Sequence, residues 1–161
     1  MITSLVFYSG VYYISLILAI FSVPSIIATL WTSNRQMYRY RLLRSLNERE
    51  RKSLPPHIIA EWMSVRSTVG YGNMLIMEVD RLNALRPAIL QATLSAILLF
   101  SLFFFPGFAE DLIIWMILTL MVITVTVVAG YLTMRRYARE YLAMAIEVEK
   151  EGREDLGVIY N

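Results

Sequence analysis

The sequence predicts an all-α integral membrane protein with three transmembrane helices and a helical cytoplasmic layer. Of its 161 residues, 57% are hydrophobic and only 17% are charged, whereas about a quarter of a soluble domain is charged. Residues 2–33, 87–109 and 112–134 contain no charged side chain. All basic residues lie in the two parts of the chain that follow the first and the third of these segments. Together these observations are typical of a membrane protein that crosses the bilayer several times.

Each uncharged segment is long enough to cross a bilayer. A helix needs about 20 residues to cross a hydrocarbon core of roughly 30 Å. It also satisfies its own backbone hydrogen bonds, which the core of a bilayer requires. We therefore predict one membrane domain, residues 1–161, with five parts: 2–33 (span 1), 34–86 (cytoplasmic helical segment), 87–108 (span 2), 111–134 (span 3) and 135–161 (cytoplasmic amphipathic helix and tail).

The placement of charge predicts the orientation. Ten of the 15 Lys and Arg residues lie between spans 1 and 2, and the other five follow span 3. Because basic residues accumulate in cytoplasmic loops, we expect the N-terminus outside and the C-terminus in the cytoplasm. The membrane would be the plasma membrane of a prokaryote or an equivalent inner membrane. Pro106 and Gly107 predict a tight outer turn, and Glu110 and Asp111 suit the first turn of the helix that follows.

The cytoplasmic parts are expected to be helical. Residues 35–52 are rich in good helix formers and extend span 1 as far as the prolines at 55 and 56. A second helix is expected from about His57 to Leu85, with a break near Gly70–Gly72. In the tail, one face carries four apolar or aromatic residues at helical spacing: Tyr137, Tyr141, Met144 and Val148. We expect this face to pack on protein rather than on the membrane surface.

Small and hydroxylated residues form stripes in the spans. In span 2, Gln91 and Ser95 lie beside a repeat of alanines, and in span 3, Thr119 and Thr126 are seven residues apart with Gly130 four residues further on. Small residues at such spacing let helices approach closely, and hydroxyl groups can bond across the contact. Helix packing is therefore the expected role of these residues. The alternative is a pore in an oligomer, lined by Gln91, Ser95, Thr119 and Thr126.

The string Thr68-Val69-Gly70-Tyr71-Gly72 resembles the selectivity filter of potassium channels. The resemblance implies a loop whose backbone carbonyls replace the hydration shell of an ion. Three features depart from that family. The distance from Ser64-Val65 to the string is shorter than the pore helix of that family needs. Arg66 lies just before the string, and the placement of charge puts the string on the cytoplasmic side. The alternative is a flexible break between two cytoplasmic helices.

The sequence offers no catalytic, cofactor-binding or metal-binding constellation, and we expect no enzymatic activity and no cofactor. The chain contains no cysteine and one histidine, His57, which lies outside the spans. Disulfides, thiolate catalysis and Cys-type zinc sites are thereby excluded. The spans lack the ionisable residues on which pumps and ion-coupled carriers usually depend. With a net charge of +2, the composition gives no reason to expect nucleic acid as a partner.

The order of elements resembles a family of uncharacterised small bacterial three-span membrane proteins. The matching features are Thr32-Ser33-Asn34-Arg35 after span 1, a basic helical segment, the apolar run 82–105 and the turn at Pro106-Gly107. The resemblance implies a terminal membrane hairpin but no activity. The topology alone also resembles the ExbB/TolQ type of proton-channel subunit.

These observations lead to two functional hypotheses. The first is a non-enzymatic membrane protein that acts through helix assembly, as a homo-oligomer or as an accessory subunit of a larger membrane complex. Its expected partners are the lipid bilayer and other copies of the chain or other membrane subunits. The alternative is an oligomeric cation channel.

Overall fold

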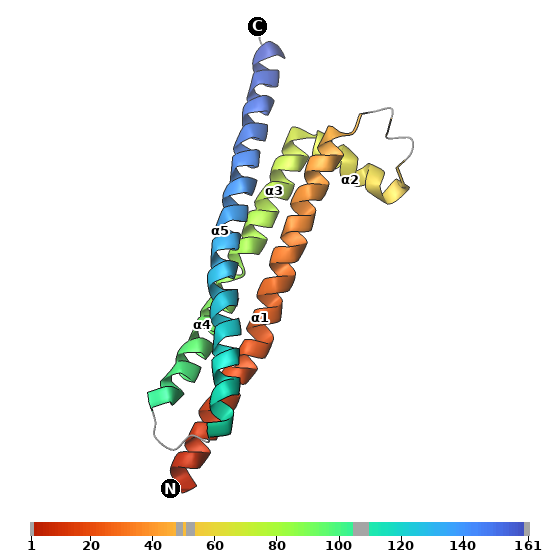
Figure 1. The fold of residues 1–161 in the computed structure, drawn as a ribbon. Coiled ribbons are helices and arrows are strands. Elements are labelled where there is room, and N and C mark those ends of the chain that lie inside the picture. The colour runs from red at the N-terminus through yellow and green to blue at the C-terminus, as the bar shows by residue number, and fades with distance from the viewer. Residues whose placement is uncertain (1, 48–49, 51–53, 105–109, 160–161) are drawn as a thin grey trace. The chain divides into compact units, whose positions relative to one another are not determined.

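A computed structural model gives the fold of the chain (Figure 1). It describes residues 2–47, 50, 54–104 and 110–159, and the side chains of residues 8–47, 50, 54–104 and 113–152. The elements are α1 (Ile2–Ser45), α2 (Pro56–Arg66), α3 (Thr68–Asn83), α4 (Arg86–Ser101), the short 3₁₀ helix η2 (Leu102–Phe104) and α5 (Glu110–Ile159). Every regular element in the described ranges is a helix, which confirms the all-α prediction.

Three helical stretches are long and apolar enough to cross a membrane. They are Tyr8–Ser45 in α1, Thr68–Phe104 through α3, α4 and η2, and Ile113–Gly152 in α5. One stretch corresponds to each predicted span. As expected, Pro87 lies in the first turn of α4, where its missing N–H is not needed. The predicted turn at Pro106-Gly107 lies outside the described residues, and α5 begins at Glu110.

Two helices extend beyond the uncharged segments. α1 continues into the basic segment but ends at Ser45, ten residues before Pro55, where the sequence predicts its end, and α5 continues to Ile159. The predicted amphipathic tail is therefore not a separate element but the second half of α5. The physical reason is that no proline or glycine occurs between Met134 and Glu151, a stretch rich in good helix formers.

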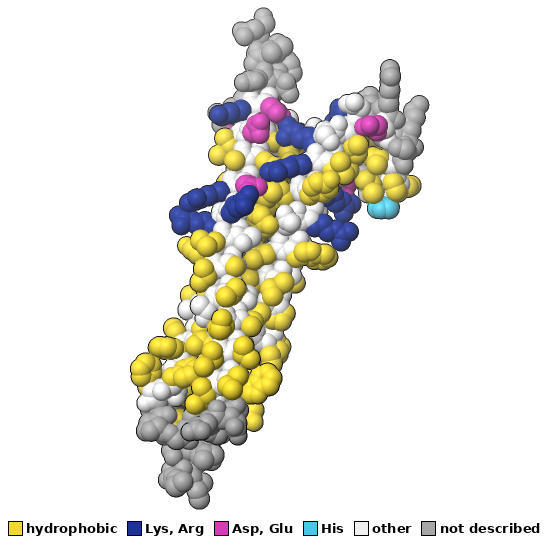
Figure 2. Space-filling view, viewed as in Figure 1, with side chains coloured by type: hydrophobic (Ala, Val, Ile, Leu, Met, Phe, Trp, Pro, Cys, Tyr) yellow, Lys and Arg dark blue, Asp and Glu magenta, His cyan; other side chains and the backbone are white. Residues whose placement is uncertain are grey.

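The chain divides into two compact units. Unit 1 is Met1–Leu30 with Ala84–Met134, and unit 2 is Trp31–Asn83 with Arg135–Asn161. Unit 1 contains only three charged residues in its sequence: Arg86, Glu110 and Asp111. All others belong to unit 2. In the view of Figure 2, hydrophobic side chains cover the described part of unit 1, whereas the Lys, Arg, Asp and Glu side chains gather on unit 2.

Unit 1 is built around a seam in which small side chains lie among larger apolar ones. The buried positions of α1 are spaced by four, three and four residues, and those of α5 by seven, seven and four, which is the spacing of helices that pack as a coiled coil. The buried residues on these helices are Ser15, Ala19, Ser22 and Ile26 on α1; Ile89, Ala92, Ser95 and Leu99 on α4; and Met116, Ile123, Gly130 and Met134 on α5. Leu85, before α4, and Leu102, in η2, are also buried. Such a seam brings helix backbones close together.

Unit 2 is built around bulky side chains. Its buried apolar residues are Met37, Tyr40 and Leu43 on α1; Trp62 and Val65 on α2; Tyr71, Leu75 and Leu82 on α3; and Tyr141 and Val148 on α5. The predicted packing of the tail on protein agrees with the burial of Tyr141 and Val148. Tyr137 and Met144 are half-buried. The removal of apolar side chains from water stabilises a core of this kind.

The corner between α2 and α3 lies at Ser67, three residues before the predicted break. Ser67 has an extended backbone (φ −73°, ψ 124°), so α2 ends there. The backbone N–H of Gly70 donates to Ser67 Oγ at 3.3 Å. Ser67 is therefore the N-cap of α3, since the cap side chain satisfies an N–H that the first turn leaves without a helical partner. A serine cap, rather than the glycine pair, sets the boundary.

Candidate functional site

A buried hydrogen bond joins two helices of unit 1. The hydroxyl of Ser95 on α4 donates to the backbone carbonyl of Ser15 on α1 at 2.7 Å, and both residues are 0% exposed. A serine hydroxyl can bond to a carbonyl of its own helix. When it bonds instead to a carbonyl of another helix, it fixes the register of the two helices. The structure thus places Ser95 in a helix contact within one chain. Gln91, one turn earlier, is half-buried.

Gly130 brings α5 close to α1. A Cβ atom at position 130 would lie 2.8 Å from Cγ2 of Ile26 and 3.9 Å from Cδ1 of Leu30. Ile26 is completely buried, so its branched side chain has little room to move. The absence of a side chain at Gly130 is what permits this approach.

Two threonines of α5 bond to their own helix. The hydroxyl of Thr119 donates to the carbonyl of Trp115, and that of Thr126 to the carbonyl of Val122, both at 2.8 Å. Thr119 also lines a shallow groove of about 420 Å³ between α1 and α5. Neither Gln91 nor Ser95 lines it: the groove residues are Leu16, Ala19, Ile20, Val23, Pro24, Trp115, Leu118, Thr119, Val122 and Ile123. The structure therefore does not bring the four predicted pore-lining residues together in one chain.

The filter-like string is helical. Thr68 to Gly72 form the first turns of α3, whereas the resemblance to potassium channels implies a loop. Carbonyls in a helix point along its axis toward backbone N–H groups four residues further on, so they do not encircle an ion. Tyr71 of the string is buried, with its ring 6.3 Å from that of Tyr40 and the Arg44 guanidinium 4.9 Å from its centroid. The packing of Tyr71 and the N-cap at Ser67 explain why this string is helical and not a loop.

The two glycines of this string are predicted to respond oppositely to alanine. A Cβ at Gly70 would lie 2.7 Å from the backbone oxygen of Ser64, whereas one at Gly72 would have no atom within 4 Å. Alanine is favoured over glycine in a helix by about 1 kcal/mol, and a clash with backbone costs roughly 1–3 kcal/mol. We expect Gly72→Ala to stabilise unit 2 and Gly70→Ala to destabilise it. Thermal unfolding followed by circular dichroism in detergent measures both, and equal shifts would contradict the described corner.

A network of hydrogen bonds joins three helices of unit 2. The hydroxyl of Tyr141 on α5 donates to the carbonyl of Ser33 on α1 at 2.7 Å, and the hydroxyl of Ser33 donates to Glu78 on α3 at 3.3 Å. Glu78 is only 8% exposed. Its second oxygen lies 3.6 Å from Arg81, which also donates to the hydroxyl of Thr32 at 3.0 Å. A buried carboxylate with partners on two helices holds α3 against α1.

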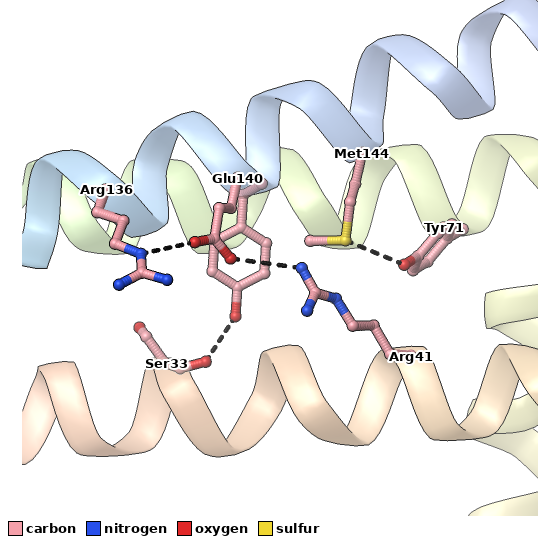
Figure 3. A network of polar contacts seen from close by, with 7 residues as sticks. Ser33, Arg41, Tyr71, Arg136, Glu140 and Met144 are labelled. Carbon is pink, nitrogen blue, oxygen red and sulfur yellow. Dashed lines mark hydrogen bonds and ion pairs between the residues drawn. The ribbon is translucent and has the colours of Figure 1, made fainter.

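Ion pairs surround this network. In Figure 3, Glu140 lies between Arg136 (2.9 Å) and Arg41 (3.3 Å). Two further pairs involve arginines of α1: Arg39 with Glu61 on α2, and Arg44 with Glu151 on α5. Exposed pairs of this kind each contribute only about 0–1 kcal/mol. These pairs connect arginines of α1 to glutamates of α2 and α5.

Two tyrosines of this unit have a raised pKa. Burial raises the pKa of Tyr141 and of Tyr40 above the ordinary value, and the nearby Glu78 carboxylate raises both further. Both residues lie beyond the uncharged segments. Each therefore keeps its proton at neutral pH, and Tyr141 remains a hydrogen-bond donor to Ser33.

A groove of about 510 Å³ lies between α3 and α5 in unit 2. Its walls are mainly aliphatic, and small residues at Gly72, Ala145 and Gly152 leave the space between them. The lining residues are Thr68, Val69, Gly72, Asn73, Ile76, Leu142, Ala145, Ile146, Val148, Glu149 and Gly152. Val69, Ile76 and Ile146 are exposed in it. The groove is thus an apolar surface on the charged unit.

Among the side chains that the structure describes, no three from His, Cys, Asp and Glu lie close enough to hold a metal ion. His57 is exposed at the start of α2.

Comparison with known proteins identifies no relative. No protein-family model, curated protein or solved structure matches the chain. The resemblance to small bacterial three-span proteins therefore stays a prediction.

The contact between Ser33, Glu78 and Tyr141 was not anticipated from sequence. A signal was nevertheless present, since Glu78 lies at a buried position of the pattern Tyr71, Leu75, Glu78 and Leu82. These positions are spaced by four, three and four residues, and only the acid departs from their apolar character.

Proposed function

We propose that the chain is a three-span integral membrane protein, with its N-terminus outside and its C-terminus in the cytoplasm, that acts without catalysis through helix assembly. It would form a homo-oligomer or serve as an accessory subunit of a larger membrane complex. The observation that carries the proposal is the division into a nearly uncharged unit and a charged unit, with three apolar helical stretches.

The surface of unit 1 supports insertion into a bilayer. Large apolar side chains, among them Phe21, Leu90 and Phe104, are mostly exposed on it. In water, each such side chain would forfeit about 1.5–3 kcal/mol relative to burial. In lipid this cost disappears, because acyl chains replace the water. The uncharged surface is thus matched to a hydrocarbon environment.

Two surfaces support assembly. Only 22%, 28% and 17% of the most apolar windows of the three stretches are buried within the chain, so most of their surface is open to other helices or to lipid. In unit 2, the groove between α3 and α5 exposes aliphatic side chains beside many charges. Since this unit is proposed to face water, covering the groove with another protein would be favourable.

The experiment that tests this function combines labelling with mass measurement. The chain has no native cysteine, so Asn73→Cys and Gly107→Cys give single labelling sites. We expect an impermeant maleimide to label position 107 in intact cells and position 73 only after permeabilisation. In nanodiscs, particle mass is expected to exceed one 18.6 kDa chain, as a multiple of it or with a co-purifying subunit.

Three results would contradict the proposal. These are labelling of position 73 in intact cells, a strict monomer without a partner, and ion flux above that of empty liposomes. Flux would replace assembly with conduction as the function.

A further inference from the structure

Two groups of arginines in unit 2 differ in their ionic partners. Arg39, Arg41 and Arg44 each form an ion pair with a glutamate of another helix. The second set is Arg35, Arg135 and Arg139, here called the membrane-proximal arginines. These three are exposed and form no ion pair with any residue whose side chain the structure describes. Their charge is not neutralised by the described part of the chain.

The membrane-proximal arginines lie next to the uncharged segments. Arg135 directly follows unit 1, and Arg139 lies five residues after Met134, about 8 Å along α5 at roughly 1.5 Å per residue. Arg35 lies five residues after Leu30 on α1. Because the Debye length at physiological ionic strength is about 8 Å, charges in this range interact with the surface of a bilayer. Lys150 is also exposed, but it lies about 24 Å beyond Met134 along the same helix.

Trp31 lies one helical turn before Arg35 on α1. Its side chain is 63% exposed, and the guanidinium of Arg35 lies 5.9 Å from the centroid of its ring. Tryptophan is enriched where acyl chains meet headgroups. A guanidinium beside an exposed tryptophan is thereby placed among headgroup phosphates, which it can bind through two parallel N–H groups.

We propose that the membrane-proximal arginines of unit 2 bind the headgroups of anionic phospholipids. The inference rests on the proposed function, because it requires the chain to lie in a bilayer. The phosphate provides the hydrogen-bond acceptors, and the net negative charge of the lipid balances guanidinium groups that have no acidic partner in the described chain. The paired arginines farther along α1 do not contribute, since glutamates already neutralise them.

Native mass spectrometry of the protein released from nanodiscs tests this inference. The discs contain phosphatidylcholine and phosphatidylglycerol in equal amounts, and the ratio of the two retained lipids is measured. The wild type is expected to retain phosphatidylglycerol preferentially. Arg139→Gln should lower this ratio about fivefold, the factor expected from losing one basic residue near an anionic surface. Lys150→Gln removes the same charge from the same helix and should leave the ratio unchanged. Arg139→Lys keeps the charge but loses the paired N–H donors, so it should lower the ratio by less than Arg139→Gln.

Three outcomes would overturn the inference: no preference for phosphatidylglycerol in the wild type, an equal loss in Arg139→Gln and Lys150→Gln, or displacement of the lipid by soluble glycerol phosphate. The last would make a free anion the ligand. Carbonate extraction from pure phosphatidylcholine vesicles is a separate control. Release of the wild type there would contradict the three-span proposal itself, whereas retention of all variants shows that they insert and that the lipid ratio reports on headgroup binding.

Discussion

Replacing Gly130 with alanine is expected to destabilise unit 1, although alanine is the better helix former. The new Cβ would lie 2.8 Å from Cγ2 of Ile26, well inside van der Waals contact. Because Ile26 is completely buried and branches at Cβ, the methyl group cannot rotate away, and α5 must move away from α1. Overpacking costs roughly 1–3 kcal/mol and exceeds the gain in helix propensity of up to about 1 kcal/mol. Larger residues at position 130 should cost more.

Gly10 provides the matched control for this substitution. It lies in α1, in the same unit, and a Cβ there would have no atom within 4 Å. Gly10→Ala should therefore leave stability unchanged or raise it. Both variants are measured by unfolding in mixed detergent micelles with increasing denaturing detergent. If Gly130→Ala were as stable as Gly10→Ala, the close approach of α5 to Ile26 would not exist.

The largest loss is expected for Tyr141→Ala. Tyr141 is completely buried in unit 2 and its hydroxyl donates to the carbonyl of Ser33. Removing a buried aromatic side chain costs about 3–5 kcal/mol, because apolar contacts are lost and a cavity remains. A loss of this size is comparable to the whole stability of a small unit. We therefore expect unit 2 to unfold and to become sensitive to protease.

Two variants separate the ring from the hydroxyl and control for the substitution itself. Tyr141→Phe keeps the ring and removes one hydrogen bond, which should cost about 1 kcal/mol. Tyr38→Ala removes the same side chain from an exposed site on α1 and should change stability by less than about 0.5 kcal/mol. Thermal unfolding and limited proteolysis provide the comparison. Equal effects of Tyr38→Ala and Tyr141→Ala would show that Tyr141 is not part of a core.

The helical content and the number of apolar stretches could be predicted because each depends on composition within one segment. An uncharged run can lie in a bilayer, and a single segment there satisfies its own backbone hydrogen bonds only as a helix. The basic segment after Ser33 likewise contains good helix formers, and α1 continues into it as far as Ser45. Such properties are local, and tertiary contacts are not needed to read them.

The finer features depend on contacts between distant residues. The alanine repeat of span 2 predicts a face through Ala92, but the buried face also includes Ile89 and Ser95, because the hydroxyl of Ser95 bonds to the carbonyl of Ser15, 80 residues away. Gly70 and Gly72 alone predict a flexible break, but Ser67 caps α3 and both glycines lie inside that helix. The stripe through Ser95 predicts a helix contact, but no pattern in the sequence identifies Ser15 as its partner.

The unbroken course of α5 also constrains how the length of this chain can change in evolution. Gly130 and Tyr141 lie on one continuous helix, with buried neighbours at seven-residue spacing on either side: Met116 and Ile123 before them, Met134 and Val148 around Tyr141. One residue inserted between Ile123 and Gly130 would rotate Gly130 by about 100° about the helix axis and turn it away from Ile26. Within either unit, insertions in this helix should therefore be tolerated mainly in multiples of seven, which restore the buried face.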